Sequence, residues 1–124
     1  MDKYLLVLLG GAIGSLARYL ASTAILNRYT GRFPLGTVIV NLTGCFLIGA
    51  IMTALTQKTA PHPNWRLFLV VGFLGGFTTF SSFAWETYTA ARDGSPWIGF
   101  FNVIISVILG YLAVFLGSIS VTKR

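Results

Sequence analysis

Four long apolar segments, separated by short polar connections, constrain the fold of this chain more than any other feature of its sequence. They lie at about residues 4–26, 35–56, 67–91 and 97–121. Each is close to the ~20 residues with which an α-helix crosses the ~30 Å hydrocarbon core of a bilayer. The connections carry helix breakers, which are Pro34, Pro61, Pro63, Gly94 and Pro96. The sequence therefore predicts an all-α membrane protein in which residues 1–124 form one domain of four transmembrane helices.

Composition supports a membrane location and argues against a nucleic-acid partner. Only 10% of the side chains are charged, whereas about 25% is typical of soluble domains. The formal net charge is +6, but the Lys and Arg residues are scattered rather than clustered as nucleic-acid recognition requires. We therefore expect the lipid bilayer as a partner and no nucleic acid, with Lys and Arg anchoring the ends of the spans.

The third apolar segment contains groups that a helix facing lipid would leave without partners. Between Gly72 and Glu86 it carries glycines, hydroxyls and phenyl rings, and each polar group within hydrocarbon needs a hydrogen-bond partner. Gly75 and Gly76 also loosen the helix. Non-helical backbone at this depth is tolerated only where it is buried in protein or lines a water-filled space. We expect a break in the third helix near Gly75–Thr78, in the wall of a polar path.

Polar side chains recur at helical spacing in the neighbouring spans. Thr37 and Asn41 are four residues apart in the second span, as are Asn102 and Ser106 in the fourth. The third span adds Thr78, Thr79, Ser81, Ser82, Glu86, Phe80 and Phe83. A lone Ser or Thr most often makes only an interhelical hydrogen bond. Because three spans carry such stripes, we expect a permeation or binding path.

The chemistry of these groups favours a small anion. Hydroxyls and the Asn amide donate hydrogen bonds, and phenyl edges carry the positive end of the ring quadrupole. Arg18 lies too deep in the first span to be a simple terminal anchor. It either snorkels toward the side of Arg28 and Arg32 or attracts anions in a vestibule, and we favour the vestibule. Glu86 opposes an anion path unless it is protonated, or lies off the path and is hydrogen-bonded to hydroxyls.

The positive charges hardly favour one orientation in the membrane. On one side lie Lys3, Lys58, Arg66, Lys123 and Arg124; on the other lie Arg28, Arg32 and Arg92, with Arg18 nearer this second side. Because orientation follows the Lys and Arg bias of short loops, we expect insertion in both orientations. Four short helices also enclose little space, so we expect an antiparallel pair with a second copy.

Catalytic interpretations find no support, and we expect no enzyme. Cys45 is the only cysteine, which excludes an intramolecular disulfide and a multi-cysteine metal site. His62, the only histidine, lies between two prolines in a loop with no nearby nucleophile. The glycines at 72 and 76 are not followed by the Gly-Lys-Ser/Thr of a phosphate loop.

Residues 75–86, Gly-Gly-Phe-Thr-Thr-Phe-Ser-Ser-Phe-Ala-Trp-Glu, closely resemble the signature of the Fluc (CrcB) fluoride channels of bacteria. The resemblance covers the whole chain and includes Gly10, Gly11, Gly14 and Arg18 in the first span and Gly36, Thr37, Asn41 and Gly44 in the second. It implies a multi-pass protein of the bacterial inner membrane that forms an antiparallel, dual-topology homodimer. Its two pores would export fluoride passively and so relieve fluoride toxicity.

The resemblance also implies roles for individual residues. The fluoride pathway would include Phe80, Phe83, Asn41, Thr79, Ser81, Ser82, Ser106, Asn102, Glu86 and Arg18. Backbone carbonyls of Gly75 and Thr78 would bind a structural Na⁺ at the dimer interface. Two departures from the family pattern concern donors: Ala84 stands where many relatives have a hydroxyl, and Asn102 stands where several have Tyr or Ser.

The alternative function is a proton-coupled exporter of the small multidrug-resistance type, which also has four spans and dual topology. That chemistry needs a carboxylate in the first span, where this chain carries Arg18. The only acid within a predicted span is Glu86. A third alternative, a non-conducting assembly subunit, accounts for the number of spans but not for the donor-rich stripes.

Overall fold

The computed structural model describes residues 2–57 and 63–122, and the chain is helical there, without strands. Its elements are α1 (Lys3–Leu26), α2 (Leu35–Thr56), α3 (Pro63–Trp65), the π-helix η1 (Arg66–Leu74), α4 (Gly75–Phe77), α5 (Phe80–Arg92) and α6 (Pro96–Val121). Within these described residues, four helical stretches are long and apolar enough to cross a membrane: α1, α2, the run Pro63–Arg92, and α6. The predicted all-helical class with four membrane-capable helices is confirmed.

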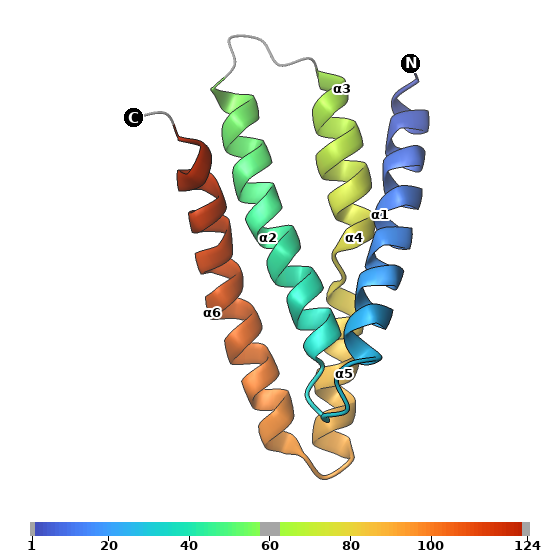
Figure 1. The fold of residues 1–124 in the computed structure, drawn as a ribbon, viewed down its shortest axis with the longest axis vertical. Coiled ribbons are helices and arrows are strands. Elements are labelled where there is room, and N and C mark those ends of the chain that lie inside the picture. The colour runs from blue at the N-terminus through green and yellow to red at the C-terminus, as the bar shows by residue number, and fades with distance from the viewer. Residues whose placement is uncertain (1, 58–62, 123–124) are drawn as a thin grey trace.

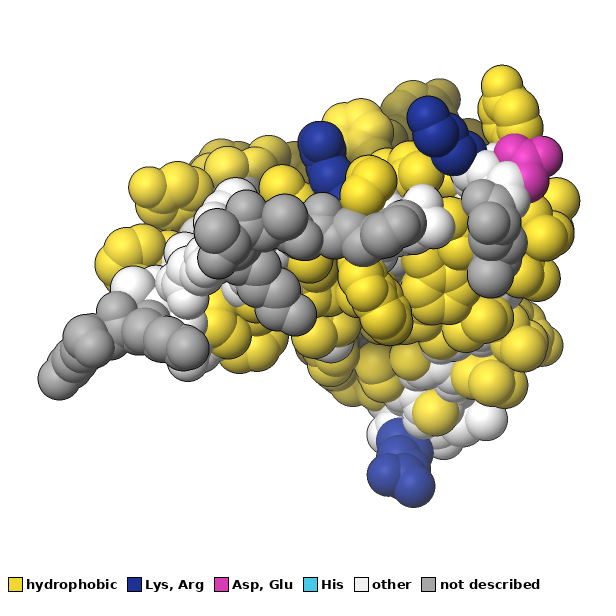
Figure 2. All heavy atoms as spheres, turned by 90° about the horizontal axis from the view of Figure 1, so that it is seen from above, with side chains coloured by type: hydrophobic (Ala, Val, Ile, Leu, Met, Phe, Trp, Pro, Cys, Tyr) yellow, Lys and Arg dark blue, Asp and Glu magenta, His cyan; other side chains and the backbone are white. Residues whose placement is uncertain are grey.

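The helices associate as two pairs joined at one end. α2 packs along α6, whereas α1 packs along η1 and α4, and α5 continues beyond the break to pack against α6. In Figure 1 the two pairs lie closest where α1 leads into α2 and α5 leads into α6, and they diverge toward the end that carries the N-terminus. Viewed from that end, apolar side chains cover most of the described surface and charged ones are few (Figure 2). Many large apolar side chains are exposed along the helices, as expected for surfaces that face lipid.

The third span is broken, as predicted, but at Thr78 and Thr79, whereas Gly75 and Gly76 remain helical in α4. Thr78 (φ −84°, ψ 157°) and Thr79 (φ −148°, ψ 112°) have extended backbone. Thr79 caps α5, because its Oγ1 accepts a hydrogen bond from the Ser82 N–H at 3.2 Å, which is the usual task of a Thr at this position. Asn41 of α2 supplies the other partners. Its Oδ1 accepts from the Thr79 N–H at 2.8 Å, and its Nδ2 donates to the Thr79 carbonyl at 3.0 Å.

The stretch before the break is a π-helix, which the sequence does not predict. At its end the Gly75 N–H donates to the carbonyls of both Val70 and Gly72. π-helical segments are rare and occur frequently at functional sites. Here the π-helix lies against α1, and the three residues of α4 separate it from the break.

Glycines allow α1 and η1 to approach each other closely. A Cβ on Gly10 would overlap the carbonyl of Phe68, and a Cβ on Gly14 would overlap the carbonyl of Phe73. From the other side, a Cβ on Gly72 would lie 2.9 Å from the carbonyl of Val7. Gly10 and Gly14, which are four residues apart in the first span, therefore allow a close contact within the chain, as small residues at this spacing do between helix pairs in membranes.

Gly14→Ala should destabilise the fold far more than Gly11→Ala. A Cβ on Gly11 meets only the Gly72 carbonyl, at an ordinary 3.9 Å, whereas one on Gly14 forces α1 away from η1. We expect Gly14→Ala to lower the free energy of unfolding by about 1–3 kcal/mol, the usual cost of overpacking, and Gly11→Ala by less than about 0.5 kcal/mol. Titration of the detergent-solubilised protein with SDS, followed by circular dichroism, measures both. Equal midpoints would contradict the close contact.

Candidate functional site

A pocket of about 420 Å³ opens beside the break in the third span. Its walls come from α2, from η1 and the break, from the first turn of α5, and from α6. Many of the residues predicted for the site line it: Asn41, Gly75, Thr78, Thr79, Phe80, Phe83 and Ser106. The fold therefore brings residues from three sequence stripes to one place.

Asn41 forms hydrogen bonds to the backbone at the break and also lines this pocket. Its amide pairs with both backbone groups of Thr79. The amide nitrogen carries two hydrogens, and the bond to the Thr79 carbonyl uses one of them. Because Asn41 lines the pocket, the amide can hold the break and still offer a donor to a ligand.

The carbonyls of Gly75 and Thr78 lose their usual helical donors at the break. In a continuous α-helix they would accept from the N–H groups of Thr79 and Ser82, four residues on. Here the Thr79 N–H donates to Asn41 Oδ1 and the Ser82 N–H donates to Thr79 Oγ1. Gly75 and Thr78 both line the pocket, and oxygen ligands suit small hard cations. The two carbonyls therefore fit a small cation such as Na⁺.

The two phenyl rings of α5 stand at the pocket with different exposure. Phe80 is 77% exposed, whereas Phe83 is half-buried. Their ring centroids are 5.5 Å apart with planes tilted by 43°. A phenyl ring this exposed beside a pocket is not covered by its own chain, and exposed apolar surface of this kind marks interaction sites.

Hydroxyls connect this pocket to a second one of about 370 Å³. Thr79 lines both pockets, and its Oγ1 donates to Ser82 Oγ at 3.1 Å and lies 3.4 Å from Ser81 Oγ. Ser82 lines the second pocket, whereas Ser81 is exposed on α5. Thr79 and Ser82 thus form a polar bridge between the two pockets.

Arg18, Thr37 and Glu86 line the second pocket together. Thr37 Oγ1 donates to Glu86 Oε1 at 2.7 Å, which is the kind of hydroxyl partner expected for this carboxylate. Within the described part of the chain, Glu86 Oε2 is buried without a hydrogen-bond partner. Sequence reasoning missed Ser15 and Ser22, which line the same pocket. Their helical spacing of three and four residues from Arg18 is a signal that could have revealed them.

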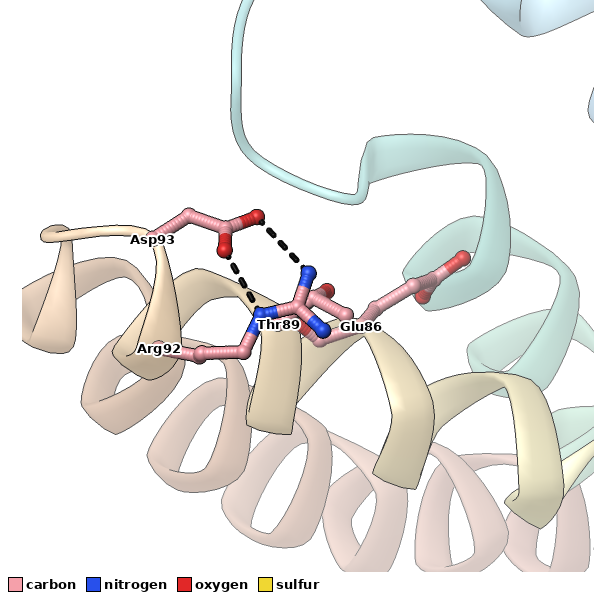
Figure 3. Close-up of polar contacts among 4 residues, drawn as sticks. All are labelled: Glu86, Thr89, Arg92 and Asp93. Carbon is pink, nitrogen blue, oxygen red and sulfur yellow. Dashed lines mark hydrogen bonds and ion pairs between the residues drawn. The ribbon is translucent and has the colours of Figure 1, made fainter.

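Glu86 is separate from the charged pair at the end of α5. In Figure 3 its side chain extends toward α2, away from Arg92 and Asp93. Arg92 Nε donates to Asp93 Oδ1 at 2.8 Å, and this exposed pair lies where α5 ends. The hydrogen bond from Arg92 lowers the pKa of Asp93 below its ordinary value. The Arg92–Asp93 pair is thus local, and among the described residues no hydrogen bond or ion pair joins it to Glu86.

The two candidates in the fourth span have different surroundings. Ser106 lines the first pocket. Asn102, by contrast, is only 1% exposed, and its Nδ2 donates to Thr87 Oγ1 at 2.9 Å. Sequence reasoning did not select Thr87, although its spacing of four residues from Phe83 allows the hydrogen bond to the Phe83 carbonyl that the structure contains.

Comparison with known proteins gives a consistent result over nearly the whole chain. The family model described as CrcB-like protein, Camphor Resistance (CrcB), matches residues 5–118. A protein of Solibacter usitatus named fluoride-specific ion channel FluC is 63% identical over 117 residues, covering 94% of this chain and 96% of the relative. Proteins of the same name from Acidobacterium capsulatum and Hydrogenobaculum sp. are 47% and 44% identical, over 94% and 93% of this chain and the same shares of the relatives.

Proposed function

Since the chain belongs to the CrcB-like family, we propose that it is a fluoride-selective channel through which fluoride leaves the cytoplasm passively. It is a multi-pass protein of the inner membrane with four membrane-capable helices. The observation that carries the proposal is the convergence of a phenyl pair, an amide and hydroxyls at one pocket (Phe80, Phe83, Asn41 and Thr79). The FluC names of the relatives support the choice of ion.

Neutral donors suit an ion that must pass through rather than remain bound. Amide and hydroxyl hydrogens and the positive edges of phenyl rings replace the water around a small anion. They do so without a fixed cation, which would hold the anion too tightly, because conduction needs binding weak enough for the ion to leave. Arg18 lines the second pocket together with Thr79 and Ser82, and its positive charge there attracts anions toward the path.

Family membership argues against the proton-coupled exporter. α1 contains no Asp or Glu that could exchange protons, and the relatives are named as channels. Electrode recordings of fluoride efflux from liposomes that hold the purified protein test the proposed function. We expect rapid efflux under a fluoride gradient, independent of a pH gradient, and little chloride efflux. Fluoride efflux at the rate of protein-free liposomes would overturn the proposal.

We infer that two copies assemble antiparallel and complete the pathway between them. Support comes from the first pocket, whose edge carries the largely exposed ring of Phe80. In an antiparallel pair, the same face of the second copy covers this ring. The weak Lys and Arg bias of the loops permits the opposite insertion that an antiparallel pair requires.

Dual insertion predicts that each end of the molecule is accessible from both sides of the membrane. Gln57 follows α2 and Asp93 lies between α5 and α6, at opposite ends of the fold (Figure 1). With Cys45→Ser as background, we expect Gln57→Cys and Asp93→Cys each to react with an impermeant maleimide from both sides in intact cells and inverted vesicles. Labelling of each site from one side only would rule out dual topology.

We further propose that the carbonyls of Gly75 and Thr78 hold Na⁺ between the two copies. When bound, Na⁺ supplies positive charge to carbonyls whose helical donors are used elsewhere. We expect the dimer to dissociate at lower detergent concentration when Na⁺ is replaced by N-methyl-D-glucamine, as size-exclusion chromatography would show. An unchanged dimer and unchanged fluoride flux would count against this site.

A further inference from the structure

Where α5 meets α6, a series of hydrogen bonds leads from α6 to the backbone of Phe83. Ser106 Oγ donates to Asn102 Oδ1 at 3.4 Å, and Asn102 Nδ2 donates to Thr87 Oγ1 at 2.9 Å. Thr87 Oγ1 in turn donates to the Phe83 carbonyl at 2.8 Å. The series therefore ends on a residue that lines the first pocket.

The middle of this series lies away from the pocket and inside the helix contact. Asn102 is 1% exposed, and neither Asn102 nor Thr87 is among the residues that line the first pocket, although Phe83 and Ser106 are. Gly99 marks the same contact, because a Cβ there would lie 2.9 Å from the Thr87 carbonyl. The helices thus touch closely at Thr87, and the amide of Asn102 fixes their relative rotation at that point.

We propose that Asn102 and Thr87 are positioning residues for the Phe83 ring, acting on the ion path through the backbone of α5. This inference rests on the proposed channel function. α5 is held at its start by Asn41, through Thr79, and one turn beyond Phe83 by Asn102, through Thr87. The two attachments fix the position of the first turn of α5 along its axis and its rotation about that axis. They therefore also fix the edge of the Phe83 ring that faces the pocket.

The hydrogen bond between Asn102 and Thr87 is buried within the membrane, so no other partner replaces it when it is lost. Asn102 is 1% exposed, and a hydrocarbon core supplies no water to replace a lost partner, so removal of the Thr87 hydroxyl leaves the Asn102 amide without its acceptor. The least costly response is rotation of α5 against α6. That rotation moves Phe83 while the rest of the bundle, including the α1–η1 pair, stays in place.

The test compares variants that differ by one hydroxyl or one amide. Thr87→Val and Asn102→Leu remove the attachment at similar volume, whereas Thr87→Ser keeps the hydroxyl. Thr89→Val is the matched control, because among the described residues Thr89 Oγ1 donates only to a carbonyl of its own helix, that of Glu86, at 3.1 Å. Fluoride efflux is measured per folded protein. Separately, 4-fluorophenylalanine is placed at position 83 and its ¹⁹F resonance is recorded in detergent.

We expect Thr87→Val and Asn102→Leu each to slow efflux by about threefold to tenfold, which one hydrogen bond within a membrane can account for. The double variant should be no slower than either single one. Thr87→Ser and Thr89→Val should match the wild type. The ¹⁹F resonance should shift or split in Thr87→Val and remain single in Thr87→Ser and Thr89→Val.

Two results would overturn the positioning role. One is wild-type efflux together with an unchanged ¹⁹F resonance in Thr87→Val. The other is failure of Thr87→Ser to restore the efflux and resonance of the wild type. If the wild-type protein itself passes no fluoride, the channel function fails, and the ¹⁹F measurement still decides whether Asn102 and Thr87 position the ring.

Discussion

Fluoride efflux is expected to fall to the level of protein-free liposomes when Phe80 or Phe83 is replaced by Ile. Isoleucine keeps the bulk and apolarity of the side chain but lacks the positive ring edge that contacts an anion. Apolar replacements of similar volume are usually tolerated in packing, so the two variants should fold and elute as the wild type does. Because Phe80 is 77% exposed, its replacement removes few packing contacts within its own chain.

The control for these variants is Phe115→Ile, which changes an exposed ring on α6 outside both pockets described here. It should pass fluoride at the wild-type rate. Efflux near the wild-type rate in both Phe80→Ile and Phe83→Ile would show that the rings only pack, and the assigned path would have to be abandoned.

Asn41→Asp should also abolish fluoride efflux, and it should destabilise the fold as well. The amide makes two hydrogen bonds to the backbone of Thr79. Aspartate keeps the acceptor for the Thr79 N–H but replaces the donor to the Thr79 carbonyl by a second oxygen. An unsatisfied buried group costs about 1–3 kcal/mol, and a negative charge in the pocket repels an anion.

Flux and SDS titration separate the two effects of this change. Asn27→Asp serves as the control, because it makes the same chemical change at an exposed position after α1. We expect it to leave stability and flux nearly unchanged. Wild-type efflux in Asn41→Asp would show that the amide is not part of the anion path. An unchanged SDS midpoint would show that it does not hold the break.

The break in the third span could be predicted only approximately from sequence, because its causes are partly local. Thr79 offers a new N-cap to α5, but its other backbone partners come from Asn41 in the second span. The π-helix could not be predicted in this way. η1 packs closely on α1 at Gly10 and Gly14, and a contact between two segments far apart in the chain cannot be inferred from local sequence.

For the site, sequence spacing identified the helix faces but not the partners. The stripes placed Asn41 on one face of the second span. The structure shows in addition that its amide forms hydrogen bonds to the N–H and the carbonyl of Thr79. Asn102 and Ser106 share a face by spacing, yet only Ser106 lines the first pocket. Which of the two reaches the pocket depends on where α5 meets α6, and the spacing within one helix contains no information about that.

The interruption of the third span also has an electrostatic consequence. A helix carries a partial positive charge at its N-terminus and a partial negative charge at its C-terminus. A continuous helix keeps both charges at the membrane surfaces, where water screens them. Here the C-terminus of the helical run that ends at Phe77 lies next to the N-terminus of α5, which begins at Phe80. Both ends lie beside one pocket, which Thr78 and Thr79 line. One interruption therefore creates neighbouring regions of opposite polarity deep within the protein, without a charged side chain at either.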